Sequence, residues 1–143
     1  MRSLTDEVVG FLLDGGPPPR DVKAKAVEHI VDGVAVMLAG SRTDCAGRLV
    51  EYVKDRGGKP TATVIGFGFK SSPSDAALVN GTSGHADDYD DTQLSTSPSR
   101  IYGLMTHPTV PVLAAALAVG EAVECSGGDL LDAFIAGFEV ECK

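Results

Sequence analysis

The sequence predicts an all-α domain with at most one small extended element. Hydrophobic residues make up 43% of the 143, only 6% are aromatic and tryptophan is absent, so the core must rest on small aliphatic side chains, which favour closely packed helices. Apolar residues recur at helical spacing through most of the chain. Several of these stretches follow a serine, threonine or aspartate that can cap a helix.

Two helices are expected in the first forty residues. Ser3 or Thr5 can cap the first, which two glycines and three prolines end. The second should run from about Pro19 to Gly40. We expect its apolar residues to form one continuous buried stripe, consisting of Val22, Ala26, Val27, Ile30, Val31, Val34, Ala35 and Leu38.

A third helix and a short extended piece should follow. Thr43 or Asp44 can cap the helix, and Gly57 and Gly58 stop it. Residues 61–65 have the β-branched content of a strand. The glycines and phenylalanines after it are expected to be turn and packing residues, because neither phosphate-loop pattern, G-x-G-x-x-G or G-K-[ST], is completed.

The fourth predicted helix begins after Ser72, with proline at its first position and a carboxylate, Asp75, at its third. It contains Gly81 and Gly84, each costing about 1 kcal/mol relative to alanine in a helix. A turn at Asn80-Gly81 would avoid this cost. Close approach between buried helices would offset it, and we favour this reading because the neighbouring residues are small.

Two further helices complete the prediction. Residues 94–102 are rich in serine and proline and should be loop, and Thr106-His107-Pro108 can start the next helix. Its inward residues should be Val112, Leu113, Ala116, Leu117 and Val119. Ser126 or Asp129 can cap the last helix, which shows no end signal before Lys143. We therefore expect one helical domain, residues 1–143, forming the amino-terminal part of a longer two-domain protein.

Charge and composition exclude several function classes. The net charge of -8 disfavours nonspecific binding to nucleic acid or to an anionic membrane surface. Three cysteines without metal-site spacing favour a reduced, cytoplasmic chain. No secretory signal is visible, and no apolar run approaches the roughly 20 residues that cross a bilayer.

The residues capable of chemistry are concentrated between Asn80 and Pro108. This stretch contains two of the three histidines and four aspartates. If residues 84–92 are helical, His85, Asp88 and Thr92 share one face. Crowding and burial would raise the pKa of at least one carboxyl group toward the range that is useful for acid/base chemistry.

The same stretch carries a family resemblance. NGTSGHADDYDDT followed by THPTVPVLAAALA resembles the amino-terminal helical part of the MmgE/PrpD family, and the resemblance extends from about Leu4 to the end. Its specific part is an H-x-x-D-x-D-D-T block together with a later T-H-P. The family includes 2-methylcitrate dehydratase, cis-aconitate decarboxylase and iminodisuccinate epimerase. The resemblance implies a lyase or isomerase, most readily a dehydratase, that needs no cofactor or metal and acts on a small polycarboxylate.

The resemblance also implies roles for particular residues. Asp88 and His107 match acid/base positions, and Thr92 matches a hydroxyl that orients the substrate. We add His85 and Arg100 as groups that bind substrate carboxylates. In the family, lysines from later in the chain complete the site, so this stretch alone should be inactive, and the complete protein is expected to be a homodimer. Three further residues are assigned no catalytic role: Asp87 and Asp90 should cap helices or face water, and His29 should be a packed or surface residue.

Two other functions stay open at this point. Residues 87–91 satisfy the D-D-x-x-D pattern that holds Mg²⁺ in helical diphosphate enzymes, although no second acidic motif is visible. An EF-hand is excluded because Gln93 stands where its loop requires glycine. The remaining alternative is a noncatalytic helical module whose apolar surface binds a second copy.

Overall fold

The structure is a computed structural model that describes residues 3–93 and 106–142. The described residues form six helices and one two-stranded sheet, which confirms the predicted fold class. In chain order the elements are α1 (Leu4–Asp14), α2 (Arg20–Gly40), α3 (Asp44–Arg56), β1 (Ala62–Val64), β2 (Phe69–Ser71), α4 (Pro73–His85), α5 (Thr109–Ala122) and α6 (Gly127–Glu141). Four of the helices begin at the predicted caps, because Ser3, Thr43, Ser72 and Ser126 all occupy N-cap positions.

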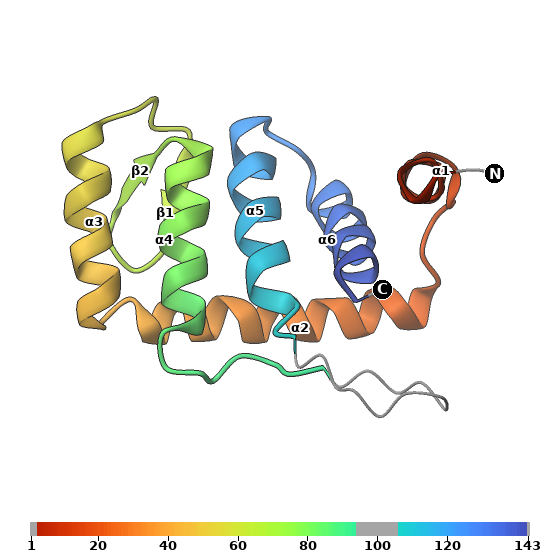
Figure 1. Ribbon diagram of the computed structural model, residues 1–143, viewed down its shortest axis with the longest axis horizontal. Coiled ribbons are helices and arrows are strands. Elements are labelled where there is room, and N and C mark those ends of the chain that lie inside the picture. Colours follow the sequence, from red (N-terminus) through yellow and green to blue (C-terminus); the bar gives the residue numbers. More distant parts are fainter. Residues whose placement is uncertain (1–2, 94–105, 143) are drawn as a thin grey trace.

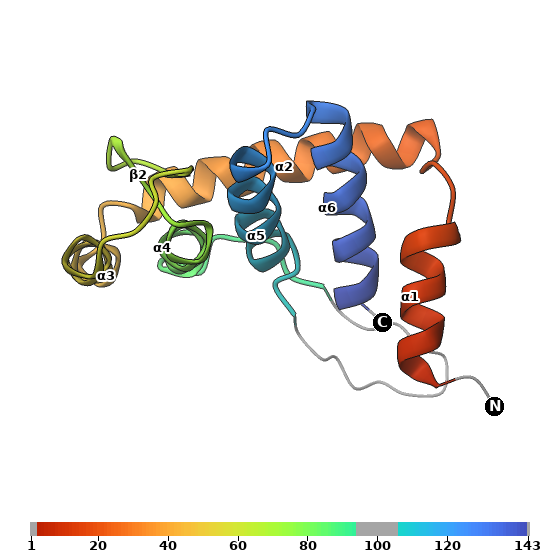
Figure 2. The same ribbon diagram turned by 90° about the horizontal axis from the view of Figure 1, so that it is seen from above.

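The longest helix, α2, runs beneath the others. Figure 1 shows α3, α4 and α5 standing side by side along it, with α6 beyond α5. Seen from above, α4 and α5 lie next to each other and both cross α2 (Figure 2); α4 runs toward α2 and α5 runs away from it, so the two helices are antiparallel. The end of α4 and the start of α5 therefore lie on the same side of the domain, close to α2.

The buried side of α2 differs from the predicted stripe. The residues that bury are Ala26, Gly33, Met37 and Gly40, whereas Val31 is 64% exposed and Leu38 is 55% exposed. Apolar residues occupy more than one side of α2, and periodicity alone cannot choose between these sides. Close packing makes the choice, because a side chain at Gly40 would meet the backbone carbonyl of Ser83 in α4.

Contact between α4 and α5 explains the glycines of α4. A Cβ added at Gly84 would lie 2.6 Å from Val110 Cγ1, and one at Gly81 would lie 3.7 Å from Ala114 Cβ. Close approach of buried helices, as predicted, therefore requires glycine at position 84. The prediction for α5 itself is only partly correct, since Leu113 is buried but Val119 is 55% exposed.

The predicted extended segment is β1, which pairs with β2 as an antiparallel hairpin with Ala62 opposite Ser71. Gly66 and Gly68 have φ angles of 83° and 71°, as expected of turn residues. Asn80 of α4 is buried and holds the hairpin, since its amide donates to Thr63 O at 3.0 Å and its oxygen accepts from the Ile65 N–H at 2.9 Å. The Asn80-Gly81 turn that was the alternative does not form.

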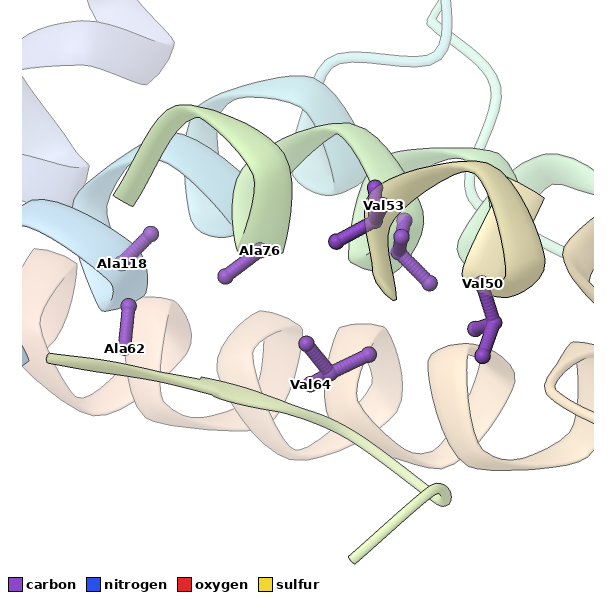
Figure 3. Close-up of a cluster of buried hydrophobic side chains, with 7 residues drawn as sticks. Val50, Val53, Ala62, Val64, Ala76 and Ala118 are labelled. Carbon is purple, nitrogen blue, oxygen red and sulfur yellow. The ribbon is translucent and has the colours of Figure 1, made fainter. Parts of the chain in front are cut away.

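Two apolar clusters fill the domain. The first lies between the hairpin, α3, α4 and α5 and is shown in Figure 3; its buried members are Val50, Val53, Ala62, Val64, Ala76, Val79 and Ala118. The second lies between α2, α5 and α6, with buried members Ala26, Met37, Val110, Leu113, Ala114 and Phe134. The first cluster consists only of alanine and valine, as the composition predicted, whereas the second also contains Met37, Leu113 and Phe134.

Helix α1 stands apart from the rest of the domain. It buries none of its residues, and both views place it beyond α6 (Figures 1 and 2). Its apolar side chains are accordingly open to solvent; Leu4 is 77% exposed and Leu13 is 78% exposed. Of the helices that the structure describes, none combines the length and the apolar character needed to cross a membrane.

Candidate active site

The polar block begins where α4 ends. The expectation that residues 84–92 are helical is wrong, because α4 stops at His85 and a turn follows. Asp88 has a positive φ of 56°, a left-handed conformation that aspartate tolerates better than most residues, and its N–H donates to His85 O at 3.1 Å. This turn breaks the predicted i, i+3, i+7 face and sends residues 89–93 back toward α5.

A backbone bridge then brings His107 to this turn. Gln93 N donates to Thr106 O at 2.9 Å, and Thr106 N donates to Gln93 O at 3.3 Å. The two ends of the segment 94–105, which lies outside the described residues, are thereby held together. His107, next to Thr106 and just before α5, is brought against the residues that follow α4.

Two histidines and two aspartates meet at this point. His85 Nδ1 lies 2.9 Å and 3.1 Å from the two carboxylate oxygens of Asp90. His107 Nδ1 lies 3.4 Å from Asp90 Oδ1, and its Nε2 lies 3.8 Å from Asp88 Oδ1. The two imidazole rings are in edge contact, with centroids 4.7 Å apart. The turn and the bridge thus assemble a cluster with acid/base capacity from residues that are up to 22 positions apart, His85 to His107.

Asp90 lies at the centre of the cluster, which corrects the sequence-based expectation that it caps a helix or faces water. Its side chain is only 1% exposed, whereas Asp88 is 75% exposed. The hydrogen bond that His85 donates to Asp90 raises the pKa of His85 above its ordinary value of 6.5, against the opposing effect of burial. Asp87 is exposed, as expected.

Asp91, the next residue, has a different task. Its carboxylate accepts hydrogen bonds from the backbone N–H of Thr109 at 3.1 Å and from the Thr109 hydroxyl at 2.8 Å, so it caps the start of α5. Because that hydroxyl proton is used, Thr109 Oγ1 can accept a hydrogen bond from His29 Nδ1, 3.2 Å away on α2. The His29 ring also packs on Phe138. His29 is thus a packed residue, as predicted, but with a partner that the sequence did not indicate.

The end of α6 also approaches the site. The pKa of the Glu141 carboxyl group is raised, chiefly by partial burial and then by the negative charge of Asp91, while His107 acts in the opposite direction. Sequence reasoning gave Glu141 no role, because it lies 34 residues beyond His107 and belongs to no motif. Only the packing of α6 on α5 and α2 brings it near.

The structure brings together three of the five predicted site residues, Asp88, His107 and His85. Thr92 is exposed on the stretch between Asp91 and Gln93, and it forms no hydrogen bond with another described residue. Arg100 lies outside the described residues. Asp88 and His85 are the solvent-exposed members of the cluster.

The donor atoms also bear on metal binding. One donor from each of His85, Asp88, Asp90 and His107 lies within 4.8 Å of the others, so the cluster has both the chemistry and the size to take a divalent cation. The hydrogen bond of His85 to Asp90 and the 3.4 Å approach of His107 to the same carboxylate already account for the arrangement without a metal. The D-D-x-x-D reading fits less well, because residues 87–91 lie on a turn and Asp91 is engaged with Thr109.

Comparison with known proteins gives consistent results. The family model for the MmgE/PrpD N-terminal domain matches residues 7–143. The chain is 34% identical to the cis-aconitate decarboxylase of Mus musculus over 148 aligned positions, covering 99% of this chain and 28% of that protein. It is 30% identical to the cis-aconitate decarboxylase-like protein oryM of Aspergillus oryzae, covering 96% of this chain and 29% of that protein. The chain therefore spans less than a third of the length of these relatives.

Proposed function

The chain belongs to the MmgE/PrpD family, and on that premise we propose that it supplies part of the active site of a lyase or isomerase that acts on a small polycarboxylate. The observation that carries this proposal is the cluster formed by Asp88, Asp90, His85 and His107. The cluster combines an exposed carboxylate with two imidazoles, and the described residues offer no comparable group of histidines and acids. The two curated relatives, both named for cis-aconitate decarboxylation, support the same class.

The proposed chemistry follows from the groups present. Loss of carbon dioxide or water, or inversion at carbon, moves an electron pair next to a carboxylate, and a positioned acid or base must move the matching proton. We assign that transfer to His107 and Asp88, whose Nε2 and Oδ1 atoms lie 3.8 Å apart. At this separation both atoms can contact the same substrate group. His85, Thr92 and Arg100 are proposed to bind substrate carboxylates.

Charge limits what this chain can do alone. A polycarboxylate would meet the carboxylates of Asp88 and of the nearby Glu141, while the histidines near it are cationic only when protonated. Beyond the single positive charge of Arg100, opposite charge must therefore come from elsewhere to hold a multiply charged anion. We propose that residues of the longer protein beyond this domain supply it and that residues 1–143 alone are inactive.

Among the possible reactions, the names of the two relatives favour decarboxylation of cis-aconitate or a similar acid. The dehydratase activity expected from the sequence stays a prediction, as do the absence of a cofactor, the homodimer and the cytoplasmic location. Pocket residues outside this chain would decide the substrate. A substrate panel separates the reactions directly.

The test compares residues 1–143 with the full-length protein that contains them, using cis-aconitate, 2-methylcitrate and iminodisuccinate. We expect turnover of one of the three by the full-length protein only. There, Asp88→Asn and His107→Ala should each lower kcat by about 100-fold or more, the scale of a lost acid or base. Asp87→Asn is the matched control, because Asp87 is an exposed aspartate of the same turn and should leave kcat within about twofold. Failure of the full-length protein to turn over any of the three, or unchanged kcat in both variants, would contradict the proposal.

A further inference from the structure

Asp90 differs from the other aspartates of the turn because it is buried without a permanent cation. Its side chain is 1% exposed, and no lysine or arginine among the described residues forms an ion pair with it. A buried carboxylate is costly unless hydrogen bonds replace its water. His85 Nδ1 lies within hydrogen-bond distance of both carboxylate oxygens, and His107 Nδ1 approaches Oδ1 at 3.4 Å without a well-aligned hydrogen bond.

This arrangement restricts where the imidazole protons can lie. An ionised carboxylate can only accept, so the nitrogen of His85 that faces Asp90 must carry the hydrogen. His107 Nδ1 is buried and lacks a well-aligned hydrogen bond, and Asp90 Oδ1 at 3.4 Å is its acceptor within ion-pair range. Nε2 lies on the opposite side of an imidazole ring from Nδ1. Both rings therefore keep Nε2 for an exchangeable proton, and that of His107 faces Asp88.

We propose, on the basis of the function assigned above, that Asp90 is a positioning residue that holds both His85 and His107 in the Nδ1–H form, with Nε2 of each ring turned toward the substrate. One carboxylate thus orients two imidazoles. Asp90 touches neither the substrate nor the reacting atoms. It acts through the two rings, whose remaining nitrogen can take or give a proton according to the charge state.

A purely structural role is the competing explanation, because Asp90 also connects His85 at the end of α4 to His107, two residues before α5. That connection is already made twice by neighbouring groups. Asp91 binds the backbone and hydroxyl of Thr109, and Gln93 pairs with Thr106. Asp90 is therefore not needed to hold these two parts of the chain together. We attribute the burial of its charge between two imidazoles to its effect on the orientation of the rings.

The first experiment needs no variant. With ¹⁵N-labelled histidine in the full-length protein, the nitrogen chemical shifts of the neutral imidazoles report which nitrogen is protonated. We expect His85 and His107, assigned with His85→Gln and His107→Gln, to carry the hydrogen on Nδ1. The Nε2–H form at either ring would overturn the inference that one carboxylate orients both. This measurement requires no turnover, so it tests the positioning role even if none of the three polycarboxylates is a substrate. Absence of turnover would contradict the proposed function but not the tautomer assignment.

The second experiment uses Asp90→Asn, which has nearly the same shape but removes the charge and presents an N–H group that can reverse the tautomer of a ring. We expect kcat to fall on the order of 100-fold or more with KM changed much less, as for other carboxylates that orient a catalytic imidazole. The ¹⁵N shifts should move with it. Asp87→Asn should change neither quantity. Normal kcat in Asp90→Asn, or lost kcat with unchanged tautomers, would overturn the inference, and the wild-type shifts decide it if the variant does not fold.

Discussion

The carboxylate of Asp91 accepts two hydrogen bonds from Thr109, one from the backbone N–H and one from the hydroxyl. These bonds fix the first turn of α5 to the segment that follows α4. The two residues are 18 positions apart, so the contact closes a long stretch of chain at the base of the candidate site. Hydrogen bonds to a charged group contribute more than neutral ones, and a lost helix cap typically costs about 1 kcal/mol.

The first prediction is that Asp91→Ala lowers the free energy of unfolding by about 1–3 kcal/mol, because it removes both hydrogen bonds. Thr109→Val removes only the hydroxyl contact and should cost less. Both values come from urea unfolding followed by circular dichroism. Asp87→Ala is the control, since Asp87 is exposed and should change stability by less than about 0.5 kcal/mol. Equal stability of Asp91→Ala and Asp87→Ala would show that the capping contact contributes nothing.

The second prediction concerns two identical substitutions of opposite effect. Gly84→Ala places a methyl group 2.6 Å from Val110 Cγ1 and should destabilise the fold by about 1–3 kcal/mol through overpacking. Gly47→Ala lies within α3, where the new methyl group meets nothing within 4 Å, and should stabilise by up to about 1 kcal/mol through helix propensity. Urea unfolding of the two variants measures both changes. The packing argument fails if Gly84→Ala is as stable as the wild type.

The third prediction is a pH dependence due to His85. Its pKa is raised in the folded protein above 6.5, so the folded state binds the proton more tightly than the unfolded state. The resulting stabilisation is fully present below about pH 6.5 and is lost as the pH rises through the folded pKa. Thermal unfolding of the wild type and of His85→Gln should therefore differ most at low pH, with the difference shrinking as the pH rises. A difference that grows with pH would contradict the sign of this linkage.

The fourth prediction concerns metal. We expect turnover by the full-length protein to survive exhaustive chelation, because the hydrogen bond from His85 to Asp90 and the approach of His107 to the same carboxylate already account for the cluster. Activity is measured before and after dialysis against a chelator, with metal content determined in parallel. Loss of activity that Mg²⁺ restores would instead favour the D-D-x-x-D reading, and restoration by Zn²⁺ or Mn²⁺ would point to the two imidazoles as ligands.

The helices were predictable from the sequence because their starting signals are local. Ser72 and Ser126 cap their helices through side chains that accept from the backbone N–H three residues later, a contact visible as a short sequence pattern. The face of α2 that buries was not predictable in the same way. Val31 and Ala26 are both apolar, and only the close approach of α4 at Gly40 determines which side is covered.

The site was only partly predictable, for a different reason. Asp88 and His107 belong to a recognisable motif, and they do meet. Asp90 and Asp91 are adjacent and identical, so the sequence does not show that the first contacts the histidines while the second caps α5. The difference depends on the left-handed turn at Asp88 and on where α5 begins. Nonlocal contacts of this kind leave no periodic signal in the sequence.

The bridge between Gln93 and Thr106 makes the site tolerant of changes in chain length. The residues that it joins are fixed by each other, so additions to the intervening segment would be absorbed there without displacing His107. Doubling the length of a loop costs only about 0.6 kcal/mol in closure entropy. Changes in the length of the chain between Gln93 and Thr106 are therefore compatible with an unchanged position of His107 relative to Asp88 and Asp90.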